Sequence, residues 1–536
     1  MTVTDAQLST MSEAGPGDAV GRRVSCDGER GTVRYVGKVP PTAGIWLGVE
    51  WDNPERGKHD GTHEGVQYFK CSHPTGGSFV RPRKASFGVD FLTALRQRYD
   101  MEMEQDSAEE LKIANKPVEL VGFETVCQKL SQLNSLEAVS LQGSEVAGAG
   151  PDNEIQQNTP NILSLDLSES LLASWDDVAS ITWQLIKLRE LQLSYNRLHM
   201  PANPACLSHC FASLKVLVLN STGITWSEVL VCAPMWPVLE KLCLSSNAIT
   251  VLQKPVDVLQ SLSLLDLSKN PLAGGDELQN IAHLPKLEKL ILSNTGLSSI
   301  RFNDVGPGCK TSMFPSLKCL VVENNNISEW SFVNELEKLP NLQQLSCFNN
   351  PLMTAGKSPE TVRQLIIAKV GGLQLLNKSK IQPVERRGAE LDYRKMFGRV
   401  WLECGGDRDP ERDRPSRAFA AEHPRFRTLI QKYGAPEEGE LKQQQPFALK
   451  NQLLTITFVC PDVTEKKPIE KKLPDSMNIQ KVKGLLFRLL KVPGAELRLS
   501  YTSSKMEGKE IEIDNDLKPL QFYSIEDGDR VLVRWS

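Results

Sequence analysis

Residues 239–249 read Leu-Glu-Lys-Leu-Cys-Leu-Ser-Ser-Asn-Ala-Ile, with leucine at 239, 242 and 244 and asparagine at 247. The same order of leucines and asparagine returns around Asn196, Asn270, Asn325 and Asn350. In weaker copies the asparagine position is held by Ser144, Ser170, Thr222 and Thr295. Successive copies lie between 23 residues (Asn247 to Asn270) and 30 residues (Thr295 to Asn325) apart. A fixed period of this length is typical of a solenoid.

Elementary packing explains the pattern. Each copy supplies a short strand whose leucines enter a shared core, and a single copy cannot bury its own apolar face. The asparagine amide can bond to backbone groups of the turns, which would otherwise be buried unpaired. The pattern resembles leucine-rich repeats and predicts an α/β solenoid over residues 113–385. Residues 386–403 resemble the segment that caps such arrays. Residues 404–451, rich in charged residues, proline and glutamine, are predicted to be a linker, with a short helix near residues 419–433.

Upstream of the repeats, residues 18–90 are rich in glycine, aromatic and β-branched residues. Strand-like runs at 31–37, 45–51 and 77–81 alternate with turns, which favours a small, strongly bent β-barrel. Residues 91–112 become polar with helical spacing and are predicted to be a connector.

One loop in this first domain carries a specific motif. Residues 57–61 read Gly-Lys-His-Asp-Gly, and the runs at 31–37, 46–52, 68–69 and 77–81 flank it. Together they resemble the CAP-Gly family over about seventy residues. The resemblance implies that the loop forms a groove for acidic C-terminal tails that end in an aromatic residue, such as the tail of α-tubulin.

The residue chemistry suits such a ligand. Lys58 and Arg81 can bind carboxylates, since charge-assisted hydrogen bonds are about twice as strong as neutral ones. Trp46 and Phe79 can form an aromatic wall, although each could instead belong to the core. Two loop residues, Gly57 and Gly61, are expected to shape the backbone.

The motif departs from the family at His59, where asparagine is usual. A neutral imidazole can both donate and accept hydrogen bonds, with a geometry different from that of an amide. The substitution leaves the affinity of the groove open. It also allows binding at the groove to depend on pH, because histidine can gain a proton near pH 6.5.

Residues 452–536 form a third block. A strand at 453–459, helical spacing from Ile479 to Leu489, and strands at 497–501 and 530–535 follow the order of a β-grasp. The block resembles ubiquitin-like domains, which gives an α+β fold. It ends in Trp535-Ser536 rather than Gly-Gly, so we expect a docking module and not a conjugated modifier.

Composition excludes several function classes. The net charge of −4 does not favour nucleic acid, and no apolar stretch is long enough to cross a membrane. No signal peptide is recognisable, which predicts a cytoplasmic protein. Phosphate-loop, nucleophile-elbow and zinc-protease motifs are absent, so we expect no enzyme, no catalytic residue, no metal and no cofactor.

The order of the three modules resembles the tubulin-folding cofactor E family over nearly the whole chain. The resemblance implies a cytoskeleton-associated chaperone that binds α-tubulin and acts with cofactors B, C and D to assemble or dissociate the heterodimer. Solenoid strand residues such as Val218, Asp266 and Val321 are mixed in character and favour a protein partner. Two alternatives stay open, namely a microtubule-binding adaptor and a ubiquitin-pathway scaffold that meets the proteasome.

Overall fold

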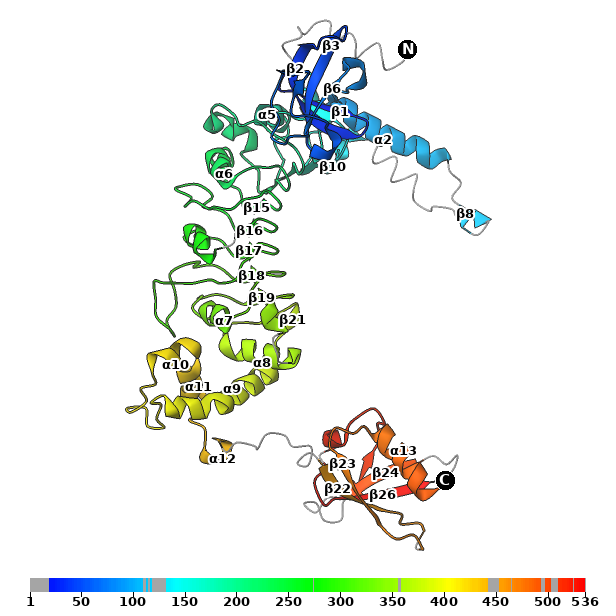
Figure 1. Ribbon diagram of the computed structural model, residues 1–536, viewed down its shortest axis with the longest axis vertical. Helices are drawn as coiled ribbons and strands as arrows, with labels where there is room; N and C mark the ends of the chain where they lie inside the picture. The colour runs from blue at the N-terminus through cyan, green and yellow to red at the C-terminus, as the bar shows by residue number, and fades with distance from the viewer. Residues whose placement is uncertain are drawn as a thin grey trace. The chain divides into compact units, whose positions relative to one another are not determined.

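The computed structural model falls into two compact units, Met1–Pro436 and Glu437–Ser536. The structure describes residues 19–108, 112–113, 116–117, 132–272, 274–354, 358–441, 453–463, 465–492, 497–502, 510–523 and 525–535. Figure 1 shows the chain coloured from blue at the N-terminus to red at the C-terminus.

In the described part of the first unit, eleven short strands form one sheet (Figure 1). From β10 to β20 neighbouring strands pair in parallel, and the terminal pair β20–β21 is antiparallel. Buried leucines stand opposite one another from strand to strand, as Leu191, Leu217 and Leu242 do. The predicted leucine-rich-repeat solenoid is therefore confirmed. The strands are β10 Ala138–Ser140, β12 Ser164–Asp166, β13 Glu190–Gln192, β14 Val216–Val218, β15 Lys241–Cys243, β16 Leu264–Asp266, β17 Lys289–Ile291, β18 Cys319–Val321, β19 Gln344–Ser346, β20 Leu375–Leu376 and β21 Ser379–Lys380.

A ladder of buried asparagines joins the coils. The Asn270 amide nitrogen donates to the carbonyl oxygens of Leu244 and Leu267, both at 2.9 Å. Its amide oxygen accepts from the backbone N–H groups of Asn247 and Ile249, at 2.9 and 3.0 Å. The predicted role of the asparagine is confirmed, because one side chain satisfies backbone groups of two adjacent coils. Short helices lie on the side opposite the strands, among them α5 Trp175–Thr182, α6 Trp226–Cys232 and α7 Trp330–Leu336 (Figure 1).

The first domain is an antiparallel sheet in the order β1-β2-β3-β6, with a small hairpin β4–β5. The strands predicted at 31–37 and 45–51 are confirmed within β2 and β3, and the run predicted at 77–81 forms β6 as far as Val80. The elements are β1 Arg23–Cys26, β2 Glu29–Lys38, β3 Ile45–Trp51, β4 Thr62–His63, β5 Val66–Gln67 and β6 Gly77–Val80, with turns of 3-10 helix η1 Pro54–Arg56 and η2 Pro82–Lys84.

This domain is joined to the first repeats by backbone and side-chain bonds. Strand β7 (Val89–Asp90) pairs in parallel with β11 (Val146–Gly148). The Glu145 carboxylate accepts from the hydroxyl groups of Ser25 and Ser86, the latter at 2.7 Å. The joint therefore does not depend on the chain connection alone.

The segment 91–112, predicted as a connector, begins as part of the solenoid. Helix α2 (Phe91–Ala108) is present as expected, but Phe91, Leu92 and Leu95 are buried in the solenoid core. These apolar residues share one face of the helix and cover the open end of the array, as a terminal cap must. The start of the predicted solenoid range 113–385 falls partly on residues 118–131, outside the described residues.

The predicted linker 404–451 differs from the structure over its first part. After the cap helix α9 (Pro383–Glu403), helices α10 (Arg417–Glu422) and α11 (Phe426–Tyr433) pack into the same core. Phe419, Phe426 and Leu429 are buried there. The fully buried Glu390 accepts from Arg425 and Lys432 at 2.7 and 2.8 Å, so charged residues in this segment help to close the solenoid.

The second unit is a five-stranded sheet in the order β23-β22-β26-β24-β25, with helix α13 (Ile479–Leu490) packed on it. Strands β22 and β26 are parallel, and β22–β23 and β24–β26 are antiparallel. The predicted β-grasp is confirmed. The strands are β22 Leu453–Val459, β23 Ile469–Pro474, β24 Leu497–Thr502, β25 Glu510–Ile513 and β26 Arg530–Trp535.

Candidate functional site

A groove of about 430 Å³ opens on the first domain. Five of the seven predicted site residues line it: Trp46, Lys58, His59, Phe79 and Arg81. The two predicted glycines do not line it but belong to the loop that forms its edge. The sequence motif therefore brings its side chains together at one concave surface.

The loop at 57–61 is fixed by its backbone. The N–H groups of Lys58 and His59 donate to the Gly77 carbonyl oxygen at 2.7 and 3.2 Å, and Gly77 N–H donates to His59 at 2.7 Å. A Cβ atom at Gly57 would lie 1.9 Å from the Thr75 carbonyl oxygen. Gly61 has a φ of +102°, and its Cβ would lie 2.0 Å from the Phe69 carbonyl oxygen. Only glycine fits at both positions.

The structure gives His59 a defined role. Its ring nitrogen Nδ1 accepts the backbone N–H of Gly61 at 3.0 Å, two residues on. An asparagine oxygen makes this same bond in an Asx turn, so the imidazole can replace the usual amide. Burial lowers the pKa of His59, the neighbouring Asp60 opposes the shift, and His63 and Lys58 add to it. Burial therefore favours the neutral ring. The bond from Gly61 favours it too, because a protonated Nδ1 could not accept a hydrogen bond.

Phe79 stands at the centre of an aromatic cluster. Its ring centroid lies 5.0 Å from that of His59 and 5.5 Å from those of Tyr68 and Phe69. Phe69 is buried, whereas Phe79 is half-buried and lines the groove. The cluster holds Phe79 in place, and its edge-to-face contacts with Tyr68 and Phe69 are a favoured arrangement of aromatic rings.

Arg81 and Trp46 form the second part of the wall. The Arg81 guanidinium carbon lies 3.7 Å from the centroid of the Trp46 ring. One guanidinium nitrogen donates to the carbonyl oxygens of Ala43 and Ile45, at 2.7 and 3.3 Å. The Trp46 indole donates to the Thr42 hydroxyl group at 2.7 Å. Arg81 is therefore held in one orientation, with its other guanidinium nitrogens left for a ligand.

Sequence reasoning missed several further residues that line the groove, among them Arg56, His63, Ser78 and Lys84. Arg56 and Lys84 come from η1 and η2, turns that carry no motif. With Lys58 and Arg81 they give four cations, against the one carboxylate of Asp27, which lies 3.3 Å from Arg56.

The hydroxyl oxygen of Ser78 is buried without a hydrogen-bond partner among the described residues. Lys58 likewise has no ion-pair partner in the described part of the chain. The groove thus offers polar groups that the protein itself does not satisfy.

Two further features are absent from the described residues. There, no group of three histidine, cysteine or acidic side chains is arranged to hold a metal ion. None of the helices in those ranges has the length and apolarity needed to cross a bilayer.

Comparison with known proteins agrees with the three modules. Family models match the CAP-Gly domain at residues 20–85, the leucine-rich repeat at 266–402 and the ubiquitin-like domain at 454–534. The C-terminal ubiquitin-like domain of mouse tubulin-specific chaperone e is 66% identical over 16% of this chain and 88% of that structure, with a TM-score of 0.15.

Two full-length relatives are similar over nearly the entire chain. Tubulin-specific chaperone E of Danio rerio is 62% identical over 519 residues, covering 97% of this chain and 99% of the relative. Tubulin-specific chaperone E of Homo sapiens is 57% identical over 528 residues, covering 98% of this chain and 100% of the relative. Identity of this extent across all three modules shows that the chain belongs to the tubulin-specific chaperone E family.

Proposed function

We propose that this chain is a tubulin-folding chaperone that holds the acidic C-terminal tail of α-tubulin in the groove of its CAP-Gly domain. One observation carries the proposal: four cations surround a groove whose wall is made by Trp46 and Phe79. Glutamate side chains and a terminal carboxylate pair with the cations, and a terminal aromatic ring packs on the wall.

The solenoid supplies the second contact, to the folded body of the tubulin subunit. Its strands carry half-buried apolar residues beside the core leucines, such as Val216, Val218, Leu264, Ile291 and Val321. Such residues favour a protein surface over nucleic acid. A tail held in the groove raises the effective concentration of the body at the solenoid, so two modest contacts give a stable complex.

The ubiquitin-like domain is proposed to dock a further factor, with tubulin-folding cofactors B, C and D as the partners implied by the family resemblance. Arg498 and Arg530 are exposed on its strands and would suit an acidic partner. The proteasome is the alternative partner of this domain. On this proposal the chain performs no catalysis and acts in the cytoplasm by binding and releasing tubulin subunits.

Calorimetric titration with a glutamate-rich peptide tests the groove. The peptide ends in tyrosine, once with a free carboxylate and once as an amide. We expect the free acid to bind at least about tenfold more tightly, and Lys58→Ala to remove most of that difference. Lys70→Ala is the matched control, because Lys70 is exposed in the same domain but does not line the groove. Equal affinity of wild type and Lys58→Ala for the free acid would refute the proposed site.

A further inference from the structure

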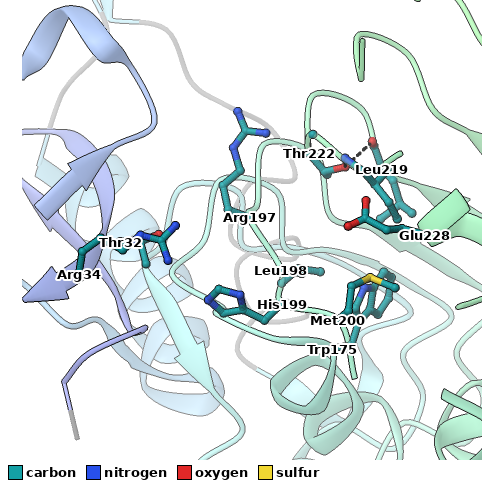
Figure 2. A pocket seen from close by; sticks show the side chains of 12 residues that line it. Thr32, Arg34, Trp175, Arg197, Leu198, His199, Met200, Leu219, Thr222 and Glu228 are labelled. Atoms are coloured by element: carbon teal, nitrogen blue, oxygen red, sulfur yellow. Dashed lines mark hydrogen bonds between the residues drawn. The ribbon is translucent and has the colours of Figure 1, made fainter. Parts of the chain in front are cut away.

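A second, smaller cavity lies where the CAP-Gly domain meets the solenoid. Its volume is about 200 Å³. Thr32 and Arg34 of β2 line one side, and residues of the second, third and fourth repeats line the other, as Figure 2 shows. It shares no lining residue with the CAP-Gly groove.

The floor of this cavity is apolar. Trp175, Leu219 and Ile224 form its buried part, and Leu198 and Met200 are only partly covered. Burial of apolar surface is favourable by about 25 cal/mol of free energy per Å² removed from water, so such a floor favours an apolar occupant.

The rim is polar and carries cations. Arg197 and His199 are exposed, and neither side chain forms a hydrogen bond or ion pair with another described residue. In Figure 2 both stand between Arg34 on one side and Glu228 on the other. Arg197 extends over Gly223, where a Cβ atom would lie 2.2 Å from one of its guanidinium nitrogens.

The acidic groups near the rim are already occupied. The Glu228 carboxylate accepts from the backbone and the hydroxyl group of Thr225, at 2.8 and 2.9 Å, and so caps α6. Arg34 donates to Glu50 at 2.8 Å. Arg197 is therefore the guanidinium at this rim that is open to an added carboxylate.

We propose that this cavity binds a peptide segment in which a large apolar side chain stands next to a glutamate or aspartate. The apolar side chain enters the cavity and the adjacent carboxylate pairs with Arg197. A volume below the usual 300–1,000 Å³ of small-molecule sites fits one side chain better than a cofactor or metabolite. The site is independent of the tail groove and does not rest on the function proposed above.

The test uses the full chain and a peptide with the core Phe-Glu-Glu, acetylated and amidated so that it presents no free terminal carboxylate. We expect saturable binding, weakened about tenfold by Arg197→Ala and more by Arg197→Glu, because a charge-assisted bond is lost and then replaced by repulsion. Replacing phenylalanine by alanine in the peptide should weaken binding by a similar factor.

Two control variants make the outcomes decisive. Arg301→Ala removes an exposed arginine elsewhere on the solenoid and should leave the affinity unchanged. Lys58→Ala should also leave it unchanged, since Lys58 belongs to the other groove. If Lys58→Ala weakens the peptide and Arg197→Ala does not, the peptide occupies the tail groove and the junction site is refuted. Absence of saturable binding, or equal binding of the alanine peptide, also overturns the proposal.

Discussion

The asparagine ladder of the solenoid and the groove of the CAP-Gly domain differ in whether their polar groups have partners within the protein. In the ladder, the Asn270 amide is fully bonded and fully buried. In the groove, Lys58 is exposed without an ion-pair partner among the described residues, and Ser78 has a buried, unpaired hydroxyl oxygen. A satisfied polar group stabilises the fold, whereas an unsatisfied one is available to a ligand. Substitutions in the two regions should therefore separate stability from binding.

The largest effect is expected from Asn270→Ala. The Leu267 carbonyl and the N–H groups of Asn247 and Ile249 lose their partner, and each such loss costs about 1–3 kcal/mol before relaxation. The Leu244 carbonyl keeps its bond from the Asn247 amide. We expect the free energy of unfolding of the solenoid to fall by about 3–4 kcal/mol, measured by urea denaturation. Asn326→Ala, an exposed neighbour of the ladder, should change it by less than about 0.5 kcal/mol. Similar values for both variants would show that the ladder does not carry the stability.

Acid should destabilise the solenoid cap. His423 is 4% exposed, and burial, followed by the charge of Lys369, lowers its pKa to about 3. Because the folded pKa lies below the unfolded value, this neutral ring contributes stability above pH 6.5 that is lost as the pH falls. One proton bound only by the unfolded chain costs about 2 kcal/mol between pH 6.5 and 5.

Denaturation of wild type and His423→Gln at pH 6.5 and 5 measures this loss. The variant should have a flatter pH dependence over this interval, since its side chain does not titrate. Glu390 does not contribute to the difference between pH 6.5 and 5. Its pKa is lowered to about 2, so the stability that it contributes is lost only below pH 4.5. An unchanged pH dependence would place the acid sensitivity in another histidine.

Arg81 is held by bonds within the fold and also presents its charge to the groove, so its substitution should change both stability and binding. Arg81→Ala loses the stacking on Trp46 and the bonds to two backbone carbonyl groups, which should destabilise the domain by about 1 kcal/mol. It should also weaken the tail peptide about tenfold. Arg81→Lys keeps the charge but not the planar stack, and should recover affinity only in part. Full recovery of both quantities by lysine would mean that charge alone matters.

The smallest effect is expected from His59→Asn. The asparagine oxygen can accept the Gly61 N–H that the imidazole accepts now, so stability and tail affinity should each change by less than about 0.5 kcal/mol. His59→Ala removes the acceptor and should cost about 1 kcal/mol of stability. If the asparagine variant behaves like the alanine variant, His59 has a role beyond the turn.

The same contrast explains how much could be predicted from the sequence. The ladder was predictable because each repeat carries its own pattern, and the groove motif at 57–61 is contiguous. Arg56, Lys84 and Ser78 escaped because tertiary packing brings them to the groove from turns and a strand without a local signal. The charged residues of the predicted linker 404–451 suggest exposure, yet Arg425 is buried and ion-paired with Glu390. Burial of paired charges depends on the partner, which sequence composition does not reveal.

The central claim is that the CAP-Gly groove holds the tubulin tail, and a double-mutant cycle on tubulin binding tests it most directly. Affinity is measured for intact heterodimer and for heterodimer lacking its C-terminal tails, each with wild type and Lys58→Ala. We expect tail removal and Lys58→Ala each to weaken binding at least about tenfold, and the two together to weaken it little further, because both remove the same contact. Fully additive losses, or an unchanged affinity after tail removal, would contradict the account.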